Sequence, residues 1–155
     1  MKYVFDSDAL IDLFNNFYPE RFPSLWVKFD ELVRDGTIIS VREVYNEIEG
    51  YGDRLPQWVK KEKDFFQQPS TEELAFVGKI FKVPHFQSLI REKARIQGKP
   101  VADPFVIAKA KALNGCVITQ EKHMPNAPKI PNVCEHFKID CTNLEGFMKK
   151  ENWKF

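Results

Sequence analysis

Acidic side chains that follow two apolar, strand-like runs are the residues of this sequence best suited to chemistry. Residues 3–5 are β-branched or aromatic and lead directly into Asp6, with Asp8 two positions later. Residues 116–118 are apolar as well, and they lead through a threonine and a glutamine to Glu121. Because ligands of open α/β sheets bind just beyond the carboxyl ends of the strands, we expect both strand-end acids at one functional edge.

A third acid is predicted from the periodicity of residues 41–49, whose apolar members recur at helical spacing. Measured from the centre of that apolar stripe, Glu47 lies about 110° away and Glu43 about 150° away. We therefore expect Glu47 to look into a cleft beside the buried face and Glu43 to face solvent. A solvated helix acid remains the alternative for Glu47.

Asp103 precedes Pro104 and opens a helix over 103–113 that is apolar nearly all round. One interpretation is pure helix capping, since aspartate is a good N-cap and proline fits the first turn. The other is a metal ligand, because a buried helix should bring its tip to the functional edge. Capping is also the alternative for Asp6, although Asp8 is the better candidate for the N-cap there, and a surface pair with Lys122 is the alternative for Glu121.

Each of these acids is ambiguous alone, but together they come from four separate elements. Oxygen-only ligands suit a hard cation, Mg²⁺ or Mn²⁺. Carboxylates gathered in one cleft repel one another unless a cation or a proton intervenes. The sequence therefore predicts a metal site made by Asp6, Glu47, Asp103 and Glu121.

The elements that would position these acids indicate one three-layer α/β/α domain over residues 1–155, with a mostly parallel central sheet. Strands are predicted at 3–5, 37–40, 116–118 and 138–140. Residues 54–97 are predicted to be wholly helical, in two or three pieces, as an insertion-like section. Within it, Ser70 and Glu73 have the spacing of a capping box.

Composition leaves the class of partner open. The chain has 155 residues, 23 Lys and Arg against 22 Asp and Glu, and a formal net charge of +1. Local basic clusters, at 60–63 and 91–95 and at Lys109 and Lys122 near the expected site, could still steer a nucleic acid. Three sparse cysteines indicate reduced thiols and a cytoplasmic protein, and neither a signal peptide nor a membrane-spanning run is expected. We expect the three tryptophans to serve as core or interface anchors.

These motifs together resemble the PIN-domain family, in particular the VapC-type bacterial toxins and a subgroup of small bacterial PIN proteins. The resemblance is carried by residues 4–11 (VFDSDALI), 39–48 (ISVREVYNEI), 102–110 (ADPFVIAKA) and 117–121 (VITQE). The small subgroup also shares the tail 130–135 (IPNVCE).

The resemblance implies metal-dependent ribonuclease chemistry and matches the family's three core acids to Asp6, Glu47 and Asp103. Glu121 matches a fourth acid that is usually Asp, and Asp8 stands where Asn, Ser or Thr is more usual. Thr119 matches a hydroxyl that supports the site. The resemblance further implies an RNA substrate, a homodimer and a neutralising antitoxin.

The expected function is therefore a Mg²⁺- or Mn²⁺-dependent endoribonuclease that acts as the toxin of a toxin–antitoxin pair. Two alternatives stay open. A haloacid-dehalogenase-like phosphatase would use Asp6 as a nucleophile, although residues 9–11 lack the small turn and hydroxyl of that family. A non-catalytic PIN-like binding module would bind no metal.

Overall fold

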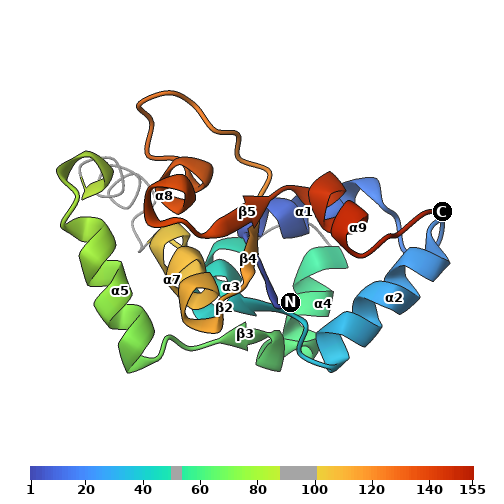
Figure 1. The fold of residues 1–155 in the computed structure, drawn as a ribbon. Helices are drawn as coiled ribbons and strands as arrows, with labels where there is room; N and C mark the ends of the chain where they lie inside the picture. The colour runs from blue at the N-terminus through green and yellow to red at the C-terminus, as the bar shows by residue number, and fades with distance from the viewer. Residues whose placement is uncertain (50–53, 88–100) are drawn as a thin grey trace.

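A five-stranded, entirely parallel sheet forms the centre of the molecule in the computed structural model, which describes residues 1–49, 54–87 and 101–155 (Figure 1). The strand order is β3-β2-β1-β4-β5. The strands are β1 (Tyr3–Phe5), β2 (Ile38–Val41), β3 (Phe66–Gln67), β4 (Cys116–Ile118) and β5 (Asp140–Thr142).

β1 is the central strand, and every one of its residues is buried. It pairs with β2 through Tyr3 opposite Ile38, and with β4 through Phe5 opposite Ile118. Strands that are covered on both faces read as continuous apolar runs, as β1 and β4 do. The register brings the residues that follow Phe5 and Ile118 to the same edge of the sheet, as expected.

Helices cover both faces of the sheet and complete three layers (Figure 1). On one face α7 packs against β1, β2 and β4, with α5 and α8 outside it. On the other face Phe5 contacts Phe29 of α2 and Phe147 of α9, with ring centroids 5.9 and 5.2 Å apart. The helices are α1 (Ser7–Asn16), α2 (Pro23–Arg34), α3 (Arg42–Ile48), α4 (Arg54–Lys61), α5 (Thr71–Phe81), α7 (Asp103–Leu113), α8 (Ile130–Phe137) and α9 (Leu144–Lys150). The predicted three-layer architecture is confirmed.

Two predictions about the elements are wrong. The section after residue 54 is not wholly helical, because it contains the 3-10 helix η1 (Lys63–Phe65) and the edge strand β3. A two-residue strand is too short to show any periodicity. β5 begins two residues later than expected, because Lys138 ends α8 with a left-handed φ of 56° and cannot start a strand. The part of the predicted helical section at 88–97 lies outside the described residues.

The tryptophans pack as predicted. Trp26 is buried between Phe14 and Phe29, and its Nε1 donates a hydrogen bond of 2.6 Å to the carbonyl of Phe17. Trp58 and Trp153 are partly buried against the same core. In the part of the chain that the structure describes, no helix is long and apolar enough to cross a bilayer.

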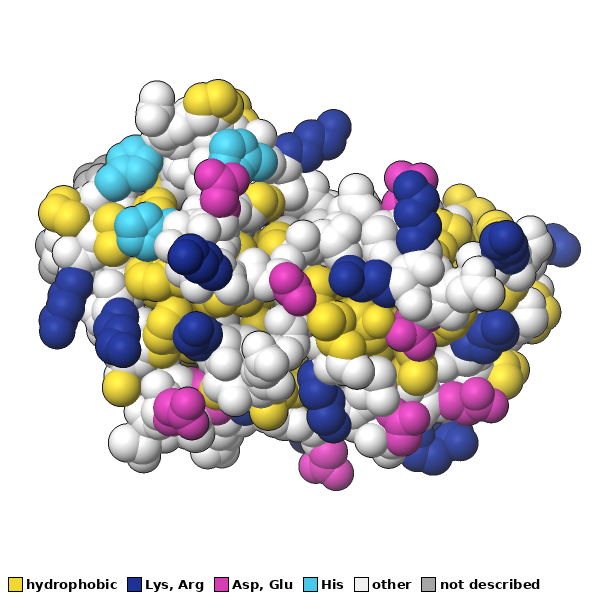
Figure 2. Space-filling view, in the orientation of Figure 1, with side chains coloured by type: hydrophobic (Ala, Val, Ile, Leu, Met, Phe, Trp, Pro, Cys, Tyr) yellow, Lys and Arg dark blue, Asp and Glu magenta, His cyan; other side chains and the backbone are white. Residues whose placement is uncertain are grey.

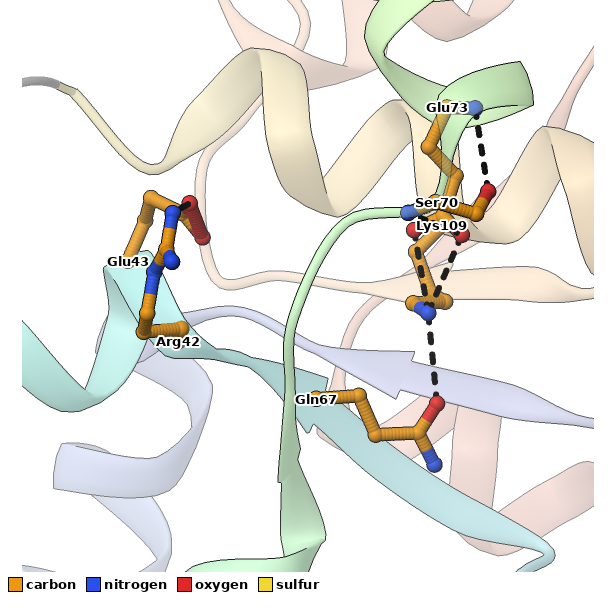
Figure 3. A network of polar contacts seen from close by, with 6 residues as sticks. All are labelled: Arg42, Glu43, Gln67, Ser70, Glu73 and Lys109. Atoms are coloured by element: carbon orange, nitrogen blue, oxygen red, sulfur yellow. Dashed lines mark hydrogen bonds and ion pairs between the residues drawn. The ribbon is translucent and has the colours of Figure 1, made fainter.

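A buried ion pair joins α7 to α5 (Figure 3). Lys109 Nζ lies 3.0 Å from Glu73 Oε1 and also donates a hydrogen bond to the Gln67 side chain. Glu73 closes the predicted capping box with Ser70 at the start of α5. The ammonium of Lys109, which we expected near the acidic site, is held between α5 and β3 by these two side chains.

From this ion pair we expect Glu73→Gln to lower the free energy of unfolding by an amount that depends on pH. The variant keeps an oxygen for the capping box. Burial alone would raise the pKa of Glu73, but hydrogen bonds from Ser70 and Lys109 lower it below the usual 4.5. A lowered pKa contributes stability that is present above pH 4.5 and lost as the pH falls below it. At pH 7 the variant leaves Lys109 buried without its partner charge, which should cost about 3–5 kcal/mol of unfolding free energy.

Urea titrations of the wild type and this variant between pH 3 and 7 would measure the difference, which should shrink at the acid end. Glu145→Gln is the matched control, because its pair with Lys149 is exposed and should be worth less than about 1 kcal/mol. A difference that does not change with pH would contradict the assignment.

A second prediction about stability concerns Gly115, which lies between the end of α7 and the start of β4, beside β1. A Cβ at Gly115 would lie 2.6 Å from the carbonyl oxygen of Lys2, which accepts a hydrogen bond from Cys116 N. We expect Gly115→Ala to lower the melting temperature and to cost about 1–3 kcal/mol. Gly78→Ala is the matched control, because nothing lies within 4 Å of a Cβ there and α5 should gain about 0.5–1 kcal/mol.

Candidate metal centre

The carboxylate of Asp6 lies directly beyond β1 and is only 3% exposed. Asp6 occupies the N-cap position of α1, but its side chain makes no capping hydrogen bond. Asp6 Oδ2 accepts a hydrogen bond of 3.1 Å from Thr119 Oγ1, whereas Oδ1 has no hydrogen-bond partner among the described residues. Helix capping therefore does not account for this acid, and the N-cap role expected for Asp8 is wrong because α1 begins at Ser7, which makes Asp6 the N-cap residue.

The negative charges of three other acids act on the carboxylate of Asp6. Its pKa is raised well above the usual range, first by burial and then by the negative charges of Asp103, Asp8 and Glu121. The structure thus brings the two strand-end acids and the helix-tip acid into one neighbourhood. A bound proton or a cation would relieve this repulsion.

Asp8 shares a hydroxyl with Asp6. Thr119 Oγ1 lies 3.2 Å from Asp8 Oδ1, and the amide of Gln120 donates a hydrogen bond of 3.0 Å to the same carboxylate oxygen. Burial and the charge of Glu121 raise the pKa of Asp8, although the Gln120 amide offsets part of this. Asp8 therefore lies inside the acidic site and not on the surface of α1.

Glu47 connects three helices. Its Oε2 accepts a hydrogen bond of 2.8 Å from Ser7 Oγ at the start of α1, and its Oε1 accepts one of 2.9 Å from the amide of Ala102. Ala102 is the N-cap residue of α7, so Glu47 fixes the place where Asp103 begins that helix. Glu47 is therefore not a solvated surface acid.

Asp103 is the first residue of α7, and no side chain caps this helix. Asp103 therefore does not occupy the N-cap position that the capping interpretation assumes. After burial, its charge is the largest contribution to the raised pKa of Asp6, which places it close to that carboxylate.

Glu121 reaches away from the strand end towards α8. Its Oε2 accepts a hydrogen bond of 2.8 Å from the amide of Ile130, the first residue of α8, and its own amide donates to Thr119 Oγ1 at 3.2 Å. The carboxylate thus links the end of β4 to a helix nine residues later in the chain.

Glu43 contradicts its prediction. It is 4% exposed instead of facing solvent, because α3 contacts α1, α4, β2 and β3 and is covered on more than its apolar stripe. Glu43 Oε1 pairs with Arg42 at 3.0 Å, and its Oε2 has no hydrogen-bond partner within the described ranges.

Sequence reasoning missed two residues that hold the site together. Ser7 donates to Glu47, and Gln120 uses both ends of its side-chain amide. Gln120 Nε2 donates to Asp12 on α1 at 3.0 Å, while its Oε1 accepts from the amide of Leu144 on α9 at 2.9 Å. Their positions beside the acids are the only signal that the sequence offers.

The donor chemistry fits a hard divalent cation, because the site offers carboxylate oxygens, one of which is buried and has no hydrogen-bond partner in the described part of the chain. The carboxylates are not arranged as a complete coordination site in this structure. Within residues 1–49, 54–87 and 101–155, no group of three or more His, Cys, Asp or Glu side chains is arranged to hold a metal ion. Binding would therefore require these side chains to rearrange around Asp6.

Thr119 generates a prediction about stability. Thr119→Val keeps the shape of this buried side chain but leaves Asp6 Oδ2 and the amide of Glu121 without their hydrogen-bond partner. We expect a loss of about 1–3 kcal/mol in unfolding free energy, measured by urea denaturation. Thr71→Val is the control, because that hydroxyl is exposed and its loss should stay within about 0.5 kcal/mol. Equal losses in both variants would show that the Thr119 hydroxyl does not support the acids.

Comparisons with known proteins give a family and two similar structures. VapBC2 from Rickettsia felis, bound to a DNA fragment from its promoter, has a TM-score of 0.48 at 14% identity, over 92% of this chain and 98% of that chain. VapBC-1 from nontypeable Haemophilus influenzae has a TM-score of 0.49 at 13% identity, over the same shares. No curated protein matches the chain. A family model described as a domain of unknown function, DUF4411, matches residues 3–155, and the chain belongs to that family.

Proposed function

We propose that the chain is a Mg²⁺- or Mn²⁺-dependent endoribonuclease that hydrolyses RNA phosphodiester bonds. The observation that carries the proposal is the buried carboxylate of Asp6, which has one oxygen without a hydrogen-bond partner among the described residues and three acids that raise its pKa. Retaining this repulsion at the edge of a sheet costs stability, and a cation that all the carboxylates share is the simplest physical reason to retain it. The resemblance of the sequence to PIN domains supports ribonuclease chemistry at this edge.

Asp6 and Asp103 are the central candidates to hold the ion, with Glu47 at the flank and a fourth carboxylate from the acids that raise the pKa of Asp6. When bound, the ion would lower the pKa of a water and neutralise charge on the leaving oxygen. The protein itself would position the carboxylates and bury them away from water. Thr119 orients the Asp6 carboxylate, and Glu47 fixes the start of α7 and hence the position of Asp103.

We further propose that the protein is a cytoplasmic toxin with an antitoxin partner and a homodimeric form. This part of the proposal rests on the resemblance of the sequence to VapC-type toxins. Basic side chains are spread among acidic ones over the face in Figure 2, without one dominant patch. The exposed Lys122, which follows Glu121 in the chain, is one candidate to steer RNA towards the site.

Asp103→Asn tests the proposed activity, because it removes one charge from the site without changing the size of the side chain. Wild type and variant would be expressed in a bacterium, and new RNA 5′ ends would be mapped after induction. We expect discrete new ends with the wild type and their loss, by about 100-fold or more, with the variant. Asp64→Asn is the matched control, because Asp64 is an exposed acid of η1 and its replacement should leave the ends unchanged.

Equal end profiles for wild type and Asp103→Asn, with both proteins folded, would contradict the ribonuclease and favour a binding module. Covalent trapping of a phosphate mimic on Asp6 would instead favour the phosphatase alternative.

A further inference from the structure

The carboxylates of Asp8 and Glu121 both turn towards an element other than the one that carries them. Asp8 sits in the first turn of α1, yet its carboxylate turns towards β4. Glu121 follows β4, yet its carboxylate turns towards α8.

The carboxylates of Asp6 and Asp8 converge on one hydroxyl. Thr119 Oγ1 is 3.1 Å from Asp6 Oδ2, 3.2 Å from Asp8 Oδ1 and 3.4 Å from Asp8 Oδ2. A hydroxyl has one proton, so it can donate fully to only one of these acids at a time. One hydroxyl proton therefore cannot neutralise two neighbouring carboxylates, whereas a shared proton or a cation would.

Asp6 Oδ1 is an independent observation that indicates a ligand at this site. It belongs to a side chain that is 3% exposed, and it has no hydrogen-bond partner among the described residues. Leaving a buried carboxylate oxygen unpaired costs free energy that a ligand would recover. Of the acids around Asp6, Asp8 is the one that shares Thr119 Oγ1 with it as a hydrogen-bond acceptor.

Glu121, in contrast, already has a structural task. Its Oε2 accepts the amide of Ile130 at 2.8 Å, and the N-cap residue of α8, Lys129, makes no side-chain capping bond. A negative charge at a helix start is favourable because the first amides and the helix dipole point towards it. An aspartate at position 121 would be one methylene shorter, which explains why a glutamate serves here.

We propose that Asp8 is the fourth carboxylate that holds the metal ion and that Glu121 is a positioning residue for α8. The inference rests on the proposed function, because it assigns roles within that same site.

Mn²⁺ titration by calorimetry would test the assignment on the full chain, with no activity assay. Asp8→Asn keeps the oxygen that accepts the Gln120 amide but loses the charge, so we expect the Kd to rise by at least about tenfold. Glu121→Gln keeps an oxygen for Ile130, so we expect the Kd to stay within about threefold. Asp12→Asn is the matched control, one turn further along α1, and should also stay within about threefold.

Hydrogen exchange of residues 130–137 supplies the second readout. Glu121→Ala should speed exchange at the start of α8 with or without Mn²⁺, whereas Asp8→Asn should leave it unchanged. An unchanged Kd for Asp8→Asn, or a larger loss for Glu121→Gln than for Asp8→Asn, would overturn the assignment. A wild type that binds no Mn²⁺ would overturn the proposed metal-dependent function itself, which is a different result.

Discussion

The position of β1 at the centre of the sheet is the constraint from which the site follows. β1 is covered on both faces and paired on both edges, and the residues around its end leave Asp6 only 3% exposed. Asp6 is the next residue, so its carboxylate is buried whether or not burial suits a charge. The remaining polar features can be understood as responses to that burial: the Thr119 hydroxyl, the Gln120 amide and the neighbouring acids all lie around the end of β1.

The two glutamates show how the fold keeps these acids in place. Each accepts a backbone amide at the beginning of a helix, Glu47 from Ala102 and Glu121 from Ile130. The aspartates, whose side chains are shorter, remain close to their own backbone at the sheet edge. The two residue types therefore have different roles: the longer glutamate side chains connect two elements, whereas the shorter aspartate side chains place negative charge at the end of the sheet.

Much of the fold could be predicted from the sequence, because β1 and β4 are continuous apolar runs and α7 is apolar on nearly all sides, and both patterns are typical of buried elements. The strand-end position of Asp6 and the capping box at Ser70 followed from local patterns. The burial of Glu43 could not be predicted, since a periodicity argument assumes that one helix face is covered, and α3 is covered by several neighbours. The bond from Glu121 to Ile130 also lay beyond prediction, because it depends on how residues 122–129 return to the sheet.

The parallel topology described above also determines the order in which the site can come into existence. Asp6 meets Thr119 across 113 positions of sequence, and β4 pairs with β5 only after α8 has been made. During synthesis Asp6 therefore emerges well before Thr119, and the contact between them forms only once these later elements have been made. Contacts this distant in sequence form slowly as well. Translation and folding together thus impose a delay between the appearance of the polypeptide and the appearance of a complete acidic site.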